Sequence, residues 1–133
     1  MFASREGKTH AETICIVDDD ASLRRSVSNL LRSLGFQVEA FESAEAFLLS
    51  DQRRTTGCLV LDQRLPGLNG FELLARLRSE ASTIRVVMLT AHGDDDLRRR
   101  AIALGVVAFL AKPFRPEDLL QAIQACLGRV PRA

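Results

Sequence analysis

The chain has 133 residues, of which 47% are hydrophobic and 26% are charged, so it is predicted to form one folded domain. Its 18 lysines and arginines nearly balance its 17 aspartates and glutamates, and it contains no tryptophan or tyrosine. A free-standing nucleic-acid-binding domain is usually basic, and one that binds single strands needs exposed aromatic side chains, so this class is disfavoured. No run approaches the ~18 consecutive apolar residues of a membrane helix, so no membrane association is predicted.

Short apolar runs alternate along the chain with amphipathic stretches, in which apolar residues recur every three or four positions. The runs are typical of buried strands and the stretches of helices. In chain order we predict a strand at 13–17, a helix from Asp20 or Ser22 to Leu34, a strand at 36–40, a helix from Ser43 to about Leu49, a polar loop at 51–57, a strand at 58–61, a loop at 63–70, a helix from Phe71 to Leu77, a strand at 84–89, a helix from Asp94 to Leu104, a strand at 106–110 and a helix from Pro116 to Leu127.

This alternation with short links predicts an α/β fold, in which a five-stranded parallel sheet is doubly wound as (βα)5 with helices on both faces. The strand at 36–40 alternates polar and apolar residues, so we expect it nearer an edge of the sheet. We assign residues 12–128 to the folded domain and 129–133 to a C-terminal tail or truncated linker. Residues 1–11 lack the apolar core of a secretory signal and are expected to form a flexible tail.

Three cysteines, Cys15, Cys58 and Cys126, form an odd count without a C-x-x-C spacing. Cys15 and Cys58 fall in apolar, strand-like runs, so we interpret them as small buried hydrophobic residues rather than as redox or metal-binding groups. Free thiols fit a reducing compartment, and the predicted localisation is cytoplasmic.

Residues that carry chemistry stand where four of the predicted strands end. In an open parallel sheet the ligand site lies beyond the carboxyl ends of the strands. Each residue taken singly has an ordinary explanation as a turn residue, a helix cap or a solvated lysine. The case for a site rests on their coincidence at these positions: Asp18, Asp19 and Asp20 after the first strand, Asp62 after the third, Thr90 after the fourth and Lys112 after the fifth.

Several carboxylates gathered at one end of a sheet need cations nearby. Two unit charges about 4 Å apart repel by roughly 4 kcal/mol at an effective dielectric of about 20. Lys112 supplies one positive charge, and Mg²⁺, which binds carboxylate, water and phosphate oxygens, is the natural second. A carboxylate beside a metal and a lysine is what aspartyl-phosphate chemistry requires, because that carboxylate attacks phosphorus.

Four segments, which lie in order on the predicted strands, resemble the receiver domain of two-component response regulators. Each is a weak motif alone, but the four together are highly specific, and the resemblance covers nearly the whole chain. It implies a flavodoxin-like, CheY-like fold, and the second and third segments look most like the FixJ-type branch. The segments are Ile16-Val17-Asp18-Asp19-Asp20, Leu61-Asp62-Gln63-Arg64-Leu65-Pro66-Gly67-Leu68-Asn69-Gly70, Leu89-Thr90-Ala91-His92-Gly93-Asp94 and Phe109-Leu110-Ala111-Lys112-Pro113-Phe114.

The resemblance implies an acidic metal pocket around a phosphoacceptor. Asp62 would accept the phosphoryl group. Asp19 would bind Mg²⁺ directly, together with Asp62 and the backbone carbonyl of Arg64, and Asp18 would complete the pocket through metal-bound water. Mn²⁺ is the expected substitute metal.

The resemblance also implies residues that bind the phosphoryl group and respond to it. Thr90 would hydrogen-bond a phosphoryl oxygen, and Lys112 would pair with the phosphoryl group. Phe109 matches an aromatic switch position, although a core phenylalanine explains it equally well. Arg64 and His92, two residues after the phosphoacceptor and after Thr90, would modulate the lifetime of the phosphoryl group.

The implied function is a phosphorylation-switched signalling domain. A sensor histidine kinase would hand its phosphoryl group to Asp62, and the surface of the helix at 94–104 and the strand at 106–110 would then shift to control a transcriptional output or a homodimer. DNA would be contacted only through an output domain absent from this chain, such as the helix-turn-helix usual in the FixJ-type branch. The domain would catalyse only its own phosphorylation and dephosphorylation, so we do not class it as an enzyme.

Partner choice on that surface stays open. Three consecutive arginines, 98–100, are most simply a solvated helix face, and the sharper interpretation is a charged dimerisation surface. Val107 and Ala108 replace the small-plus-acidic pair that is common in the family, and Gln63 is polar where an aliphatic residue is usual.

Two other functions remain as alternatives. Asp18 and Asp20 have the Asp-x-Asp spacing of haloacid-dehalogenase-type phosphohydrolases, although no insertion is large enough for the substrate cap of such enzymes. The second alternative is an unphosphorylated interaction module, which is disfavoured because no expected site residue is missing.

Overall fold

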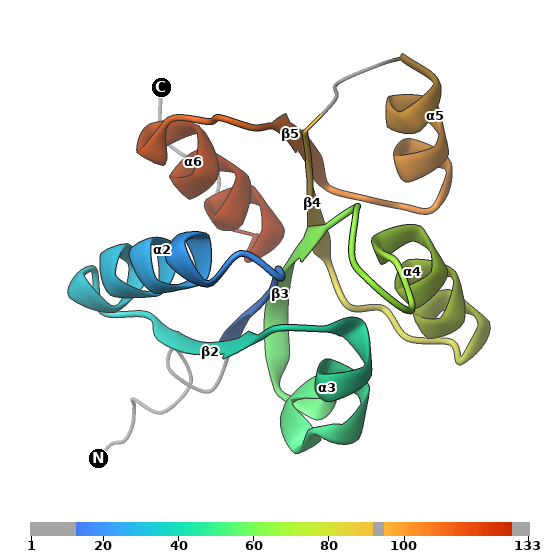
Figure 1. The fold of residues 1–133 in the computed structure, drawn as a ribbon, viewed down its shortest axis with the longest axis horizontal. Coiled ribbons are helices and arrows are strands. Elements are labelled where there is room, and N and C mark those ends of the chain that lie inside the picture. The colour runs from blue at the N-terminus through green and yellow to red at the C-terminus, as the bar shows by residue number, and fades with distance from the viewer. Residues whose placement is uncertain (1–12, 92–94, 129–133) are drawn as a thin grey trace.

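The structure is a computed structural model that describes residues 13–91 and 95–128. Five strands form one parallel sheet in the order β2-β1-β3-β4-β5, with helices on both faces (Figure 1). This is the doubly wound arrangement that the sequence predicts. In chain order the elements are β1 (Thr13–Val17), α2 (Ala21–Ser33), β2 (Gln37–Phe41), α3 (Ala44–Leu49), η1 (Asp51–Arg54), β3 (Thr56–Asp62), α4 (Gly70–Ser79), β4 (Val86–Thr90), α5 (Asp95–Ala103), β5 (Ala108–Ala111) and α6 (Pro116–Cys126).

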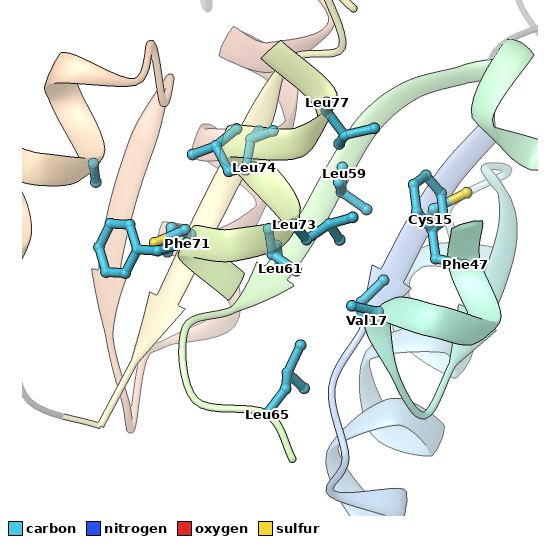
Figure 2. Packing of buried hydrophobic residues seen from close by; sticks show 14 of the residues in the cluster. Cys15, Val17, Phe47, Leu59, Leu61, Leu65, Phe71, Leu73, Leu74 and Leu77 are labelled. Atoms are coloured by element: carbon cyan, nitrogen blue, oxygen red, sulfur yellow. The ribbon is translucent and has the colours of Figure 1, made fainter. Parts of the chain in front are cut away.

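Each face of the sheet has its own hydrophobic core, because successive side chains of a strand point to opposite faces. Helices α3, α4 and α5 pack over Cys15, Leu59 and Met88 on one face, and Figure 2 shows part of this cluster. Helices α2 and α6 pack over Ile14 and Val60 on the other face. Since both faces are covered, β1 and β4 are buried along their whole lengths, which explains their continuous apolar runs.

The edge strand β2 explains the one alternating run in the sequence. Val38 is the single fully buried residue of this strand, while Gln37 and Glu39 are exposed. The prediction that this run lies at an edge is therefore confirmed.

Side-chain caps mark where α2 and α3 begin. A carboxylate oxygen of Asp20 accepts hydrogen bonds from the backbone N–H groups of Ser22 and Leu23 at 2.9 and 3.2 Å. Asp20, rather than Ser22, is therefore the cap of α2. The hydroxyl oxygen of Ser43 accepts from the third N–H of α3 in the same way, as predicted.

The prediction of a loop at 51–57 is wrong in part, because this segment contains the 3₁₀ turn η1 and the first residues of β3. The hydroxyl oxygen of Ser50 accepts a hydrogen bond from the N–H of Gln52 and starts this turn. The N–H of Thr55 then closes it on the carbonyl of Gln52. Polar residues predicted a loop here, whereas their side chains instead supply the bonds of a tight turn.

Two strands begin later than predicted, because the backbone groups before them already form hydrogen bonds to side chains or to a helix end. The strand predicted at 84–89 begins at Val86, because the N–H and carbonyl of Ile84 bond to side chains of the preceding loop and helix. The strand predicted at 106–110 begins at Ala108, because the N–H of Val106 bonds to the carbonyl of Ala101 at the end of α5. The predicted helix start at residue 94 and both predicted tails lie outside the described residues.

All three cysteines are free and buried, as predicted. Burial raises the pKa of the Cys15 thiol to about 11, and burial also raises the pKa of Cys58 well above its usual value. These thiols are therefore protonated near neutral pH and act as small apolar residues. Within the described ranges, none of the helices combines the length and the hydropathy that crossing a bilayer requires.

Four helices end in the same way, with a left-handed residue just after the last turn. Glycine holds this position after α2, α5 and α6, as Gly35, Gly105 and Gly128 with φ values of 93°, 81° and 76°. After α4 the position holds Ala81 at φ 62°, and the next N–H, of Ser82, closes on the carbonyl of Leu77. An L-residue is strained in this conformation because of its Cβ, so α4 ends with an avoidable cost.

We expect Ala81→Gly to raise the free energy of unfolding by about 0.5–1 kcal/mol, because relief of the left-handed strain outweighs the added freedom of the unfolded chain. The matched change is Gly35→Ala, where an added Cβ meets no atom within 4 Å and only the backbone strain is introduced. It should lower the free energy of unfolding by about 1 kcal/mol. Urea denaturation followed by circular dichroism measures both, and a less stable Ala81→Gly variant would contradict the strain.

Candidate functional site

The predicted site residues meet at one edge of the sheet, where β1, β3, β4 and β5 end. The parallel register pairs Asp62 with Leu89 and Thr90 with Ala111, so the ends of β3, β4 and β5 lie side by side. Asp18 and Lys112 directly follow β1 and β5, and the backbone N–H of Lys112 donates to the carbonyl of Thr90 at 2.7 Å.

Three carboxylates form a cluster at this edge. Asp18, Asp19 and Asp62 each offer one oxygen, and these oxygens lie within 4.8 Å of one another. The side chains of Asp18 and Asp62 are buried, whereas Asp19 is exposed at the mouth of the cluster. Oxygen donors of this kind suit a hard divalent cation such as Mg²⁺, so the donor set fits the predicted metal.

Lys112 is the positive charge inside the cluster. Its Nζ donates to Oδ2 of Asp18 at 2.9 Å and lies 3.4 Å from Oδ2 of Asp62. Burial alone would lower the pKa of Lys112, but the two carboxylates outweigh this effect and hold that pKa above its usual value. The ammonium group therefore stays charged, and it touches both buried carboxylates at once. The peptide bond between Lys112 and Pro113 is cis.

Asp62 is held in an unfavourable charge state. Burial, followed by the negative charge of Asp18, raises the pKa of Asp62 to about 6, while Lys112 and the N–H of Arg64 act in the opposite direction. That N–H lies 3.4 Å from Oδ1 of Asp62. One lysine thus compensates only part of the free-energy cost of burying two carboxylates. A bound cation, or protonation of Asp62, would relieve the remaining cost.

Asp18 is fixed from three directions. Its Oδ1 accepts the N–H of Asp20 at 2.9 Å, and its Oδ2 accepts from Lys112. Its backbone carbonyl accepts Nη1 of Arg24 from α2 at 2.7 Å, a contact that the sequence did not indicate. Both carboxylate oxygens of Asp18 thus have donors, and the Asp20 side chain caps α2. Use of the Asp20 carboxylate in this cap argues against its role as the acid of a hydrolase.

Gly70 shapes the loop beside Asp62, a role that its place in a predicted loop did not indicate. A Cβ at this position would lie 2.4 Å from the carbonyl oxygen of Asp62 and 2.8 Å from the Cα of Gln63. The N–H of Gly70 also donates to the carbonyl of Gln63 at 3.0 Å. A capping box between Asn69 and Glu72 starts α4 here, so the helix packs directly on the backbone of the site.

The remaining predicted residues lie around this centre. Thr90 is buried at the end of β4, and the side chain of Arg64 is exposed. His92 lies outside the described residues. Phe109 is buried in the core, and the guanidinium of Arg98 lies 5.4 Å from the centroid of its ring.

The three arginines of α5 are exposed, but they are more than a solvated face. Arg98 lies over Phe109, and Arg100 lies 4.2 Å from the centroid of the Phe71 ring. Arg99 pairs with Asp96 of its own helix. The sequence showed the arginine run but not its aromatic partners, because these come from other elements.

Known proteins are similar to this chain over most of its length. A family model described as the response regulator receiver domain matches residues 14–124. Nodulation protein W of Bradyrhizobium diazoefficiens is 44% identical over 126 residues, which are 92% of this chain and 56% of that protein. The transcriptional regulatory protein FixJ of the same organism is 42% identical over 114 residues, which are 86% of this chain and 56% of FixJ. The chain thus spans slightly more than half the length of these curated relatives.

Solved structures match the fold equally well. The response regulator StyR superposes with a TM-score of 0.82 at 45% identity, over 88% of this chain and 59% of StyR. The structure called FixJ-N superposes with a TM-score of 0.80 at 34% identity, over 92% of this chain and 98% of that chain. The chemotaxis protein CheY4 of Vibrio cholerae gives a TM-score of 0.79 at 29% identity, over 87% of this chain and 98% of CheY4.

In the absence of divalent metal, we expect Asp62→Asn to raise the free energy of unfolding at pH 8 by about 1–3 kcal/mol, because it removes a buried charge that faces Asp18. The native pKa of Asp62, about 6, lies above its usual value of 3.8, so protonation favours the native state. The advantage of the variant should therefore shrink as the pH falls through about 6 toward 4. Urea unfolding in EDTA from pH 8 to pH 4 measures this difference, and a variant less stable at pH 8 would contradict the repulsion.

Proposed function

The chain belongs to the response regulator receiver domain family, and from that premise we propose that Asp62 accepts a phosphoryl group from a sensor histidine kinase. The observation that carries this proposal is the contact of Lys112 with the two buried carboxylates. Its Nζ lies 2.9 Å from Oδ2 of Asp18 and 3.4 Å from Oδ2 of Asp62. An ammonium group this close to Asp62 is available for the negative charge that a phosphoryl group brings.

In the proposed transfer, a carboxylate oxygen of Asp62 forms a bond to phosphorus while the bond from phosphorus to a histidine nitrogen of the kinase breaks. The electron pair of the broken bond stays on that nitrogen. Lys112 then exchanges its contact with Asp62 for one with a phosphoryl oxygen, and Thr90 donates its hydroxyl to another. Hydrolysis reverses the state, because water attack on phosphorus releases phosphate and restores the carboxylate.

The carboxylate cluster supports a divalent metal in this chemistry. Asp19, Asp62 and the backbone carbonyl of Arg64 would hold Mg²⁺, with Mn²⁺ as a substitute, and Asp18 would act through a water molecule. The oxygens of the three carboxylates lie within 4.8 Å of one another. Mg²⁺ would neutralise charge on the transferring oxygens. Arg64 and His92 would adjust how readily water reaches the phosphoryl group.

We further propose that phosphorylation changes the surface formed by α5 and β5. Phe109 is buried on β5, and its partner in the sheet, Met88, lies two residues before Thr90. Movement of Thr90 toward a phosphoryl oxygen would therefore reach Phe109 through β4. Ile102 on α5 and Val107, which directly precedes β5, are 59% and 41% exposed, which suits contact with a second copy or with an output domain.

The proposed output is transcriptional. Among the relatives, FixJ is named a transcriptional regulatory protein, and this chain spans about half of its length. DNA would be contacted by an output domain beyond the matched region rather than by these residues. The chain modifies only itself in this scheme, so it acts as a switch rather than as an enzyme with turnover.

Incubation with acetyl phosphate and Mg²⁺ should add one phosphoryl group to the chain, seen by mass spectrometry of the intact protein. Asp62→Ala should abolish the adduct, and EDTA should prevent it. Lys112→Met should slow its formation by at least about tenfold, since one charged contact to the phosphoryl group is lost. Sustained hydrolysis of many phosphomonoesters that depends on Asp18 and survives Asp62→Ala would favour the hydrolase instead.

A groove next to the site supports docking of the phosphoryl donor. It has a volume of about 650 Å³ and runs between α2 and α6. Lys112 and Asp20 line one part, and apolar side chains including Leu23, Leu30 and Phe114 line much of the rest. We assign this groove to the kinase, because a protein seated there would also reach the Lys112 side of the pocket.

Leu30→Glu should slow phosphoryl transfer from a kinase that phosphorylates the wild-type chain by about tenfold, because it places a charge in the apolar groove. Labelling by acetyl phosphate should change less than twofold, since the pocket itself is intact. Leu49→Glu is the matched control, because Leu49 is 89% exposed on α3, outside the residues that line this groove. Equal transfer rates for the two variants would remove the groove from the docking surface.

A further inference from the structure

Helix α5 is attached to the domain by little apolar packing. Of its residues, Ala101 alone is fully buried and Leu97 packs half-buried against the same core, whereas the neighbouring α4 buries five. Both helices lie on the same face of the sheet (Figure 1). A helix with so small a buried face needs other contacts to fix its position.

Two arginine–aromatic contacts supply them. The Arg100 guanidinium lies 4.2 Å from the centroid of the Phe71 ring, on α4, and the Arg98 guanidinium lies 5.4 Å from that of Phe109, on β5. Both distances fall within the range of cation–π attraction. Arg99, between them, contacts only Asp96 of α5 among the ion pairs and ring contacts of the described residues.

The two rings belong to the segments that carry the site. Phe71 follows Gly70, which packs against the backbone carbonyl of Asp62. Phe109 lies on the same short strand that leads into Lys112. Each arginine therefore links α5 to a different part of the phosphoryl pocket.

We propose that Arg98 and Arg100 hold α5 in place, and that Arg98 couples the position of Phe109 to that of α5. Arg100 is the fixed contact, because Phe71 is anchored in the first turn of α4. Arg98 is the contact that changes, because displacement of the Phe109 ring removes its aromatic partner. This inference rests on the proposed function, since phosphorylation of Asp62 supplies the displacement. It identifies the residue through which the pocket controls the surface that carries Ile102.

The first test compares three neighbouring variants without phosphorylation. Arg98→Gln and Arg100→Gln should each speed amide hydrogen exchange of α5 by about two- to fivefold, which corresponds to the loss of one exposed cation–π contact. Arg99→Gln is the matched control, with a change of less than about twofold, because it removes only an exposed pair within the helix. Glutamine has nearly the helix propensity of arginine, so intrinsic helix stability is held constant. Equal exchange in all three variants would overturn the inference.

A double-mutant cycle separates the contact from general loosening. Phe109→Leu keeps an apolar side chain in the core and removes the aromatic ring. If Arg98 acts through that ring, Arg98→Gln adds less than about 1.5-fold to α5 exchange when Phe109→Leu is already present. If the effects of the two changes multiply in full, Arg98 acts elsewhere and the coupling is disproved.

The second test adds acetyl phosphate and Mg²⁺ and follows adduct mass and α5 exchange in the same samples. In wild-type protein the adduct should alter α5 exchange, and in Arg98→Gln the adduct should form normally while this response falls by at least half. A normal adduct with an undiminished response in Arg98→Gln overturns the inference and leaves the proposed function intact. Absence of any adduct in wild-type protein overturns the proposed function and the phosphorylation link, and the double-mutant cycle then decides on Arg98 and Phe109 alone.

Discussion

The bond between Lys112 and Asp18 joins the first and last strands of the fold across the end of the sheet, and the site is built around it. The two residues are 94 positions apart, and their side chains meet at 2.9 Å beside a third charge, that of Asp62. One ammonium cannot fully compensate two buried carboxylates, so the pocket keeps an unmet demand for positive charge. The divalent cation proposed for this site would relieve that imbalance by supplying the missing positive charge.

Much of the fold could be predicted from sequence because each strand is short, apolar and covered on both faces. The run that forms β1, for example, is apolar from Ile14 to Val17, and it ends where Asp18 begins the predicted site. Chain order then brings the predicted site residues to one edge of the sheet, since parallel strands present their carboxyl ends together. Boundaries were missed where a backbone group was taken by a side chain, as at Ile84, or by a helix end, as at Val106.

Contacts between elements could not be predicted from the sequence, for a different reason. No local pattern reveals that a Cβ at position 70 would collide with the backbone of Asp62, or that Arg100 lies over Phe71. From the sequence alone the arginine run of α5 is interpreted as a solvated face, because sequence periodicity indicates which side chains are exposed but not which aromatic ring a guanidinium covers. The Arg24 contact with the Asp18 carbonyl is hidden in the same way. These are the contacts that tie helices to the site.

The two edges of the sheet bear on how copies of this chain associate. β2 has five residues and presents Gln37 and Glu39 to solvent, and β5 has only four residues. Short edge strands are poor templates for another backbone, since an incoming segment would gain few hydrogen bonds, and at β2 it would also meet the carboxylate of Glu39. Growth of a continuous sheet from chain to chain is thereby discouraged, so a contact between copies, as proposed above, would fall to helical and loop surfaces, where side chains rather than main-chain amides select the neighbour.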